Sequence, residues 1–377
     1  MRKLILQHAK APGDVLVMTA LVRDIALTHP NQFQVYVDTT AKELWRHNPY
    51  ASLCLKNQVQ QDIEMFRLDY GPTLNTVSTK NRHFLCGFYD NFERQTGIQV
   101  PLLYPWPDYH LSDEERDVPL VSGRYWVIIS GGKTDFITKH WIYKRSQQLV
   151  NVLRGMDLRF VQVGAVGQGQ AISHFHPRLE NTLNLVGLST LRDVGRLIYH
   201  AEGVICPVTF AMHLTAALHK PCVVIAGGRE EWWWEAYARN LGNFGTELRE
   251  QVRVPHRFLH TIGQLDCCQR HGCWLNTVVG PDRACRHPVA VGGQIAPKCM
   301  QMIKLEHVVE AVMSYYEDGT LPPIGQPKPI VMVNGKPHIL QRGESMPLGP
   351  RSALEEALLL PEPQLIVETA AMTKIRA

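Results

Sequence analysis

Five segments of the chain combine residue types that could bind or transfer a charged group. The first is Gly13-Asp14, which stands at the start of a run of apolar residues with helical spacing. An aspartate at the junction between a strand and a helix could take a proton from a hydroxyl group as a general base. Aspartate is also a common helix N-cap, so the sequence leaves both roles open, and one does not exclude the other.

Two further segments could hold an anionic ligand. Lys139-His140-Trp141 follows the glycine turn Gly131-Gly132, where backbone N–H groups can approach a phosphate and Lys139 could neutralise it. The segment Thr209–Ala217 follows a predicted strand and begins a helix, whose N-terminus favours anions. The alternatives are a solvated lysine for Lys139 and a core histidine for His213. The candidate ligand-binding residues in the two segments, with Gly13, are Lys139, Thr209, Ala211, Met212 and His213.

A cysteine cluster forms the fourth segment, since five of the nine cysteines lie between Cys267 and Cys299. Four thiolates in one short stretch predict a tetrahedral zinc or iron site, and a site with all four positions filled is structural rather than catalytic. The predicted ligands are Cys268, Cys273, Cys285 and Cys299, with Cys267 as the alternative to Cys268 and with His271 or His287 as replacements for a cysteine. The competing interpretation is a set of reduced, buried thiols.

Three consecutive tryptophans, Trp232-Trp233-Trp234, make up the fifth segment, within Gly227–Glu235. Indole rings after a strand end could stack on a base or a sugar. They could equally form a partly buried aromatic anchor.

The elements that must position these residues alternate between strand and helix. Apolar patterning predicts the following elements: strands at 3–6, 33–37, 125–129, 159–163, 183–186, 203–206 and 222–225, and helices at 14–27, 83–96, 142–154, 189–200 (capped by Ser189), 210–219 and 304–317. This regular alternation predicts an α/β fold with two doubly wound, Rossmann-like domains that face a cleft.

The domain organisation follows from breaks in this pattern. Prolines among polar residues at 101–123 indicate an inter-domain linker. We therefore expect a first domain at 1–118 and a second at 119–319, with a cysteine-rich insertion at 264–300. Prolines recur beyond Gly319, so residues 320–377 are predicted to form an extended tail with one short helix at 353–360.

Composition excludes several classes of protein. The chain has 377 residues, 45% of them hydrophobic and 20% charged, which excludes a disordered chain. Its formal net charge of +4 and the lack of a long basic run argue against nucleic acid as a partner. The sequence has no run of 18 consecutive apolar residues, so it predicts no transmembrane helix. We therefore expect at most peripheral contact with a membrane. The short apolar run near Met1 does not suit a signal peptide, which predicts a cytoplasmic location.

Taken together, these motifs resemble glycosyltransferase family 9, the ADP-heptose:lipopolysaccharide heptosyltransferase group, over residues 1–225 and 304–317. The resemblance implies a GT-B fold whose first domain binds the acceptor and whose second binds the donor. Gly13-Asp14 is similar to the family's Gly-Asp, in which the aspartate is the proposed base. Lys139-His140-Trp141 resembles its Lys-x-Trp stretch, in which the lysine contacts the donor phosphates. Thr209 and His213–Ala217 resemble the donor motif Asp-Thr-Gly-x-x-His-Leu-x-Ala-Ala.

Two residues depart from that donor motif: Val208 stands in place of its aspartate and Phe210 in place of its glycine. The cysteine cluster is similar in kind to the four-cysteine insertion of autotransporter heptosyltransferases, although its spacing differs. The resemblance implies an inverting glycosyltransferase that moves a sugar from a nucleotide-sugar to a carbohydrate or glycoconjugate acceptor. A heptose is one candidate for the sugar, and an ADP-sugar is the expected donor. A lysine and a helix N-terminus could stabilise the departing diphosphate, so no catalytic metal is expected.

Two alternatives remain at this point. The departures at Val208 and Phe210 also suit a non-catalytic protein that binds a nucleotide-sugar or carbohydrate. The cysteine cluster and the proline-rich tail suit a metal-stapled interaction module.

Overall fold

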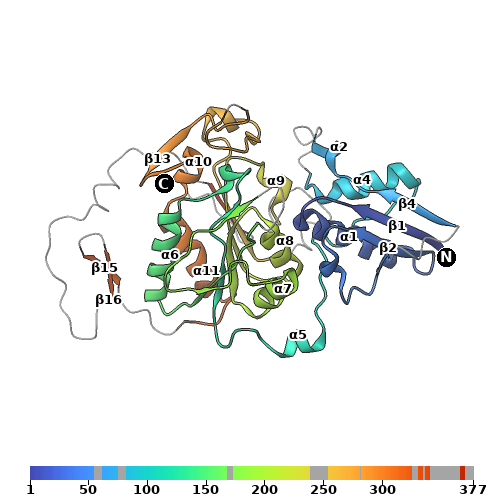
Figure 1. Cartoon of the computed structure of the whole chain (residues 1–377), viewed down its shortest axis with the longest axis horizontal. Helices are drawn as coiled ribbons and strands as arrows, with labels where there is room; N and C mark the ends of the chain where they lie inside the picture. Colours follow the sequence, from blue (N-terminus) through green and yellow to red (C-terminus); the bar gives the residue numbers. More distant parts are fainter. Residues whose placement is uncertain are drawn as a thin grey trace.

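The computed structural model describes residues 1–54, 62–74, 82–167, 173–237, 254–280 and 282–324, and the backbone of three short strands nearer the C-terminus. Its strands build two α/β units, one on each side of the view in Figure 1. All strands of the first sheet precede residue 68, and all strands of the second sheet follow residue 125. The fold class predicted from the sequence is therefore confirmed.

The first unit is a four-stranded parallel sheet with the order β3-β2-β1-β4. Its strands are β1 (Arg2–His8), β2 (Phe33–Thr39), β3 (Ser52–Leu53) and β4 (Ile63–Arg67). Its helices are α1 (Pro12–Thr28), α2 (Gly71–Leu74) and α4 (Leu85–Thr96), with a 3-10 turn η1 (Lys42–Trp45). Leu4, Ile5 and Leu6 are all buried, as expected for a central strand covered on both faces.

Helix α1 begins at Pro12, whose fixed φ suits the first helical position. The N-cap is Ala11, and Asp14 lies three residues later, where its carboxylate accepts a hydrogen bond from the Ala11 backbone N–H at 3.1 Å. The expectation that Asp14 is itself the N-cap is therefore wrong, because Pro12 sets the start of the helix earlier. Every residue from Val15 to Ile25 is buried, so α1 is enclosed rather than amphipathic.

The second unit is a seven-stranded sheet with the order β17-β12-β11-β10-β5-β7-β9. Its parallel strands are β5 (Trp126–Ile128), β7 (Phe160–Gln162), β9 (Leu183–Asn184), β10 (Gly203–Pro207), β11 (Cys222–Gly227) and β12 (His256–His260). Numbered along the chain, these six have the order 3-2-1-4-5-6, which is that of dinucleotide-binding sheets.

Helices cover both faces of this sheet. Helices α7 (Leu191–His200) and α8 (Phe210–Ala217) share a core with α1 and α4, so one apolar cluster runs through both units. Helices α6 (Tyr143–Gly155) and α11 (Leu305–Glu317) cover the opposite face, with the short α10 (Lys298–Met302) beside them. Alternate strand residues supply the two cores, as the pleat requires.

The predicted linker at 101–123 is packed rather than open. It contains α5 (Asp113–Asp117), which Ser112 caps, and Glu115 forms an ion pair with Arg192 of α7. The predicted cap of α7 is displaced by one residue: the N-cap is Thr190, because Asp193 can complete a capping box only with that residue.

Two pairs of strands lie outside the two main sheets in the later half of the chain. In the cysteine-rich insertion, β13 (Pro288–Val291) and β14 (Gln294–Pro297) form a hairpin. Within the predicted tail, β15 (Ile330–Val333) pairs with β16 (Lys336–Ile339).

The tail also contributes β17 (Ile366–Thr369), which pairs antiparallel with β12 at the edge of the second sheet. Part of the region expected to be an extended tail therefore forms strands. The helix predicted at 353–360 lies outside the described residues. Among the described helices, none has the length and hydrophobicity needed to span a bilayer.

Candidate active site

The candidate residues gather where the strand order of each sheet reverses. In the second sheet the order reverses between β5 and β10, and ligands of such sheets bind beyond the carboxyl ends of these two strands. Lys139 follows β5, and Thr209 follows β10. In the first sheet the order reverses between β1 and β4, which places Asp14 and Tyr70 together.

The two reversal points face each other because α1 packs against the start of α8. A Cβ on Gly13 would lie 3.2 Å from Cδ2 of His213 and 3.5 Å from Cα of Phe210. A side chain at position 13 would therefore crowd the ring of His213 and force it to shift. Glycine there brings Asp14 beside the N-terminus of α8.

Asp14 is half-buried and accepts a hydrogen bond from the Ala11 backbone N–H at 3.1 Å. The hydroxyl of Tyr70 lies close enough to the carboxylate for the two groups to influence each other. Burial, and then the negative charge of Asp14, raise the pKa of Tyr70, so this hydroxyl stays protonated beside the carboxylate. The ammonium of Lys10 lies over the Tyr70 ring at 4.0 Å.

Lys139 ends the 3-10 turn η3 (Ile137–Lys139) and reaches the start of α8. Its Nζ lies 2.8 Å from Oε1 of Glu230 and 3.5 Å from the carbonyl oxygen of Val208. The side chain is 20% exposed, so the interpretation as a solvated lysine is wrong.

Thr209 is the N-cap of α8, yet its side chain makes no capping hydrogen bond. Its Oγ1 is buried and has no hydrogen-bond partner within the described part of the chain. The first N–H groups of any helix also lack partners inside the helix. An anion at this position would satisfy both.

The remaining candidates on α8 are buried: Ala211, Met212 and His213. His213 Nδ1 lies 3.0 Å from the hydroxyl of Tyr237, and its Nε2 lies 3.6 Å from Oε2 of Glu235. Burial, the largest cause, lowers the pKa of His213 well below its usual value, so the ring is neutral. His213 is therefore a partnered core histidine in this structure.

Sequence reasoning missed two buried carboxyl groups in the same place, on Glu230 and Glu235. Both follow β11, Glu235 at the end of the short helix α9 (Trp232–Glu235). They are 5% and 8% exposed, respectively. The available signal was a set of charged residues directly after a strand of a parallel sheet, where ligand sites form.

The two carboxyl groups differ in their protonation state. Burial alone would raise the pKa of Glu230, but ion pairs with Lys139 and Arg229 outweigh it and lower that pKa. Burial, the charge of Glu230 and that of Asp14 raise the pKa of Glu235 to about 8, against the opposing effect of the two cations. At neutral pH, Glu230 is ionised and Glu235 is protonated.

The tryptophans form an anchor between the two units. Trp234 is 3% exposed, and its carbonyl oxygen accepts a hydrogen bond from the backbone N–H of Phe84 at 3.0 Å. Its ring lies 6.1 Å from that of Tyr70. Trp233 is also buried. The structure thus favours the aromatic anchor over a surface for stacking a base or sugar.

The cysteine-rich insertion supports the segments that carry the cations. Thr138 Oγ1 donates to the carbonyl oxygens of Leu275 (2.7 Å) and Asn276 (3.0 Å). Arg229 donates to the Leu275 carbonyl oxygen at 2.9 Å and to Oδ1 of Asn276 at 2.8 Å. A single loop of the insertion therefore holds both Arg229 and the turn that ends in Lys139.

The five thiols of the insertion are free. Burial, and then neighbouring thiols, raise the pKa of Cys299 to about 12; these neighbours are Cys273, Cys285 and Cys268. In the described part of the chain, one set of three ligand-type groups has atoms within 4.8 Å of one another: Asp266, Cys267 and His287. The predicted four-cysteine set does not meet this distance.

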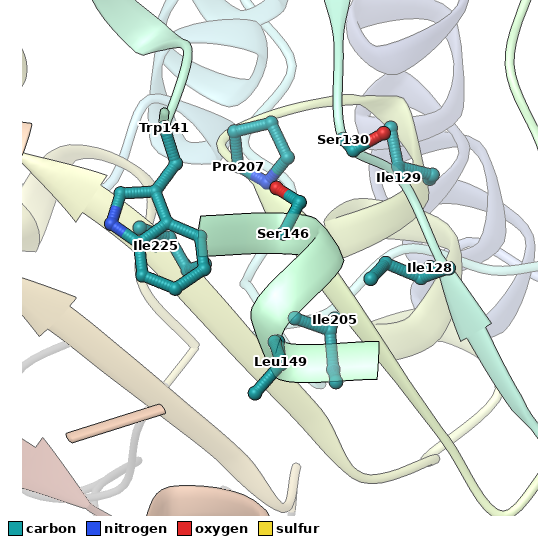
Figure 2. Close-up of a pocket in the computed structure, with 9 residues that line it drawn as sticks. All are labelled: Ile128, Ile129, Ser130, Trp141, Ser146, Leu149, Ile205, Pro207 and Ile225. Atoms are coloured by element: carbon teal, nitrogen blue, oxygen red, sulfur yellow. The ribbon is translucent and has the colours of Figure 1, made fainter. Parts of the chain in front are cut away.

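A small cavity lies beneath the reversal point of the second sheet (Figure 2). Trp141, Pro207 and Ser130 line it together with aliphatic side chains of β5, β10 and α6. Its volume of about 10 Å³ suits roughly one water molecule. A substrate cannot fit in so small a space, so this cavity is not the candidate donor site.

Residues 86–257, from α4 to β12, match the model of "Glycosyltransferase family 9 (heptosyltransferase)". The match spans 172 of the 377 residues, a little under half of the chain. The match includes Lys139, Thr209 and His213, whereas Asp14 lies outside it. This match supports glycosyltransferase activity for the chain, and no curated protein matches the chain in sequence.

Solved structures with the same fold support this GT-B-like architecture. The family 9 glycosyltransferase of Veillonella parvula is 11% identical, with a TM-score of 0.56 over 84% of this chain and 97% of that one. TibC, an iron-containing dodecameric glycosyltransferase of enterotoxigenic E. coli, is 15% identical, with a TM-score of 0.54 over 85% and 79%. E. coli ADP-heptose lipopolysaccharide heptosyltransferase II is 14% identical, with a TM-score of 0.50 over 85% and 100%.

Proposed function

We propose that this glycosyltransferase is an inverting enzyme that transfers a sugar from an ADP-sugar to a hydroxyl group of a carbohydrate or glycoconjugate. The observation that carries this proposal is the meeting of the two reversal points. It sets a carboxylate of the first unit, Asp14, against a lysine and a helix N-terminus of the second.

The donor diphosphate would lie at the start of α8. Lys139 supplies a positive charge there, and the helix supplies free N–H groups and the positive end of its dipole. The unpartnered hydroxyl of Thr209 is available to a phosphate oxygen. The buried side chains of Ala211, Met212 and His213 leave only the backbone of these residues to face the donor.

Asp14 would act as the base. It accepts the proton of the acceptor hydroxyl while that oxygen forms a bond to the anomeric carbon of the donor. The bond from this carbon to the diphosphate breaks on the opposite face, which inverts the anomeric configuration. Lys139 and the start of α8 stabilise the negative charge that develops on the leaving diphosphate. In this scheme residues 1–118 bind the acceptor and residues 119–319 bind the donor.

A heptose is the first sugar to test. TibC has been crystallised in complex with ADP-D-β-D-heptose. Val208 and Phe210 replace the aspartate and glycine of the family's donor motif, so the contacts to the sugar must differ here. These two positions make other ADP-sugars the second group to test.

A structural zinc or iron ion fits the chemistry of the insertion, because soft thiolates are suited to both metals. We propose Cys273, Cys285 and Cys299 as ligands with Cys268, for which Cys267 remains the alternative. The gathered thiols support this proposal, as does the iron reported for TibC. When bound, the metal would stabilise the loop that holds Arg229 and the Lys139 turn.

Calorimetric titration with ADP tests the donor site. Lys139→Ala should weaken ADP binding by about 1.5–3 kcal/mol, the scale of a charged hydrogen bond, which corresponds to about ten- to 150-fold. Adenosine, which lacks phosphates, should bind both proteins equally. Equal ADP affinity of the two proteins would place the diphosphate elsewhere.

A further inference from the structure

Lys139 is already occupied in the structure. Its ammonium lies 2.8 Å from Oε1 of Glu230, a side chain that is almost completely buried. The lowered pKa of Glu230 keeps that carboxylate ionised. A second N–H direction of Lys139 is taken by the Val208 carbonyl oxygen at 3.5 Å. The carboxylate of Glu230 therefore already pairs with Lys139, the cation that the proposed function assigns to the donor diphosphate.

Glu230 has a second partner that would keep it in place without Lys139. Arg229 NH1 contacts the same carboxylate oxygen, Oε1. Arg229 itself is held in place, because its other nitrogens donate hydrogen bonds to the Leu275 carbonyl oxygen and to Oδ1 of Asn276. Glu230 can thus release Lys139 and still keep its ion pair with Arg229. This remaining ion pair lowers the free-energy cost of separating Glu230 from Lys139.

We propose that Glu230 is an internal competitor of the donor diphosphate for Lys139, and that it sets the affinity of the enzyme for nucleoside diphosphates. This inference rests on the proposed function. When the diphosphate binds, Lys139 exchanges the carboxylate for phosphate oxygens. When the product diphosphate leaves, Glu230 pairs with Lys139 again, which favours release.

The charges predict the direction of the effect. Two cations and one anion meet here, beside the positive end of the α8 dipole. Glu230→Gln would remove the carboxylate that contacts both cations, which costs stability in the free protein. A bound diphosphate would remove that cost. The variant should therefore melt at a lower temperature when free but bind ADP about tenfold more tightly or better.

Glu231→Gln is a matched control. Glu231 is a neighbouring buried glutamate whose carboxylate lies near Trp274 and His271 rather than Lys139. Calorimetric titration should show wild-type ADP affinity for this variant. Inorganic pyrophosphate should repeat the gain seen with ADP in Glu230→Gln, and adenosine should show none. In the double variant with Lys139→Ala the gain should vanish, since the two residues act on one contact.

The outcomes separate the inference from the proposed function. If Lys139→Ala weakens ADP binding but Glu230→Gln binds ADP no better than wild type, the inference is overturned and the donor site stands. If Lys139→Ala has no effect, the donor site itself is wrong. If Glu230→Gln does not fold, Glu230→Asp keeps the charge but shortens the reach to Lys139. It should still bind ADP more tightly than wild type, and unchanged affinity would refute the proposal.

Discussion

Replacing Glu235 with glutamine should stabilise the folded protein at alkaline pH and much less at acidic pH. This carboxyl group is buried and lies near the negative charges of Glu230 and Asp14. Burial, and then these charges, raise the pKa of Glu235 to about 8. Lys139 and Arg229 act in the opposite direction and do not cancel the rise. The neighbouring His213 ring is neutral and offers no compensating charge.

The sign of the effect follows from the two protonation states. In the unfolded chain, Glu235 loses its proton near its ordinary pKa of about 4.5, whereas in the folded protein it keeps the proton up to about pH 8. Folding therefore takes up a proton between these values, so the contribution of Glu235 to stability falls as pH rises through this window. At 1.36 kcal/mol per unit, the cost at pH 8 is on the order of 4 kcal/mol. This corresponds to a melting-temperature difference on the order of 5–10 °C.

The assay is a melting curve of wild type, Glu235→Gln and Glu310→Gln at about pH 5, 6.5 and 8. Glu310 lies exposed on α11 and serves as the control. Buried histidines whose pKa is lowered, such as His83 at about 3, affect all three proteins equally. The gain of Glu235→Gln over wild type should therefore grow with pH. A gain that is the same at all three pH values would refute the electrostatic account of this site.

Two other changes test the insertion. Thr138→Val removes the hydroxyl that donates to the carbonyl oxygens of Leu275 and Asn276, which should cost about 1–3 kcal/mol of stability. Because the turn that carries Lys139 would then shift, calorimetry should show weaker ADP binding. Unchanged ADP affinity would show that the insertion does not support the donor site. Purified protein should contain about one zinc or iron per chain by elemental analysis, Cys273→Ser should lose the metal and melt at a lower temperature, and Cys86→Ala should keep it; fresh protein without metal would contradict the proposed site.

Local patterns were sufficient to locate the main elements of the fold and to select three residues of the candidate site. Lys139 and Thr209 follow strands of the second sheet and meet at one edge of it by topology alone, whereas Asp14 follows a strand of the first sheet and reaches them through the packing of α1 on α8. The start of α1 could also have been read from Pro12, which moves Asp14 from the N-cap to the third helical position.

Long-range contacts were beyond the sequence. The ion pair of Glu230 is with a lysine 91 positions earlier in the chain, so it depends on the packing of two loops. The pairing of β17 with β12 and the arrangement of the thiols also depend on distant segments. No periodicity encodes such contacts.

Turnover of nucleotide-sugars by wild type and Asp14→Asn tests the central claim most directly. The assay measures nucleoside diphosphate released from a panel of nucleotide-sugars, with ADP-heptose first and with candidate acceptors present. Wild type should release ADP from an ADP-sugar, and Asp14→Asn should do so about a hundredfold more slowly or worse while binding ADP with unchanged affinity. A variant that works at a near-normal rate would remove Asp14 as the base, and folded wild-type protein that releases no diphosphate from any donor would contradict the proposed transfer.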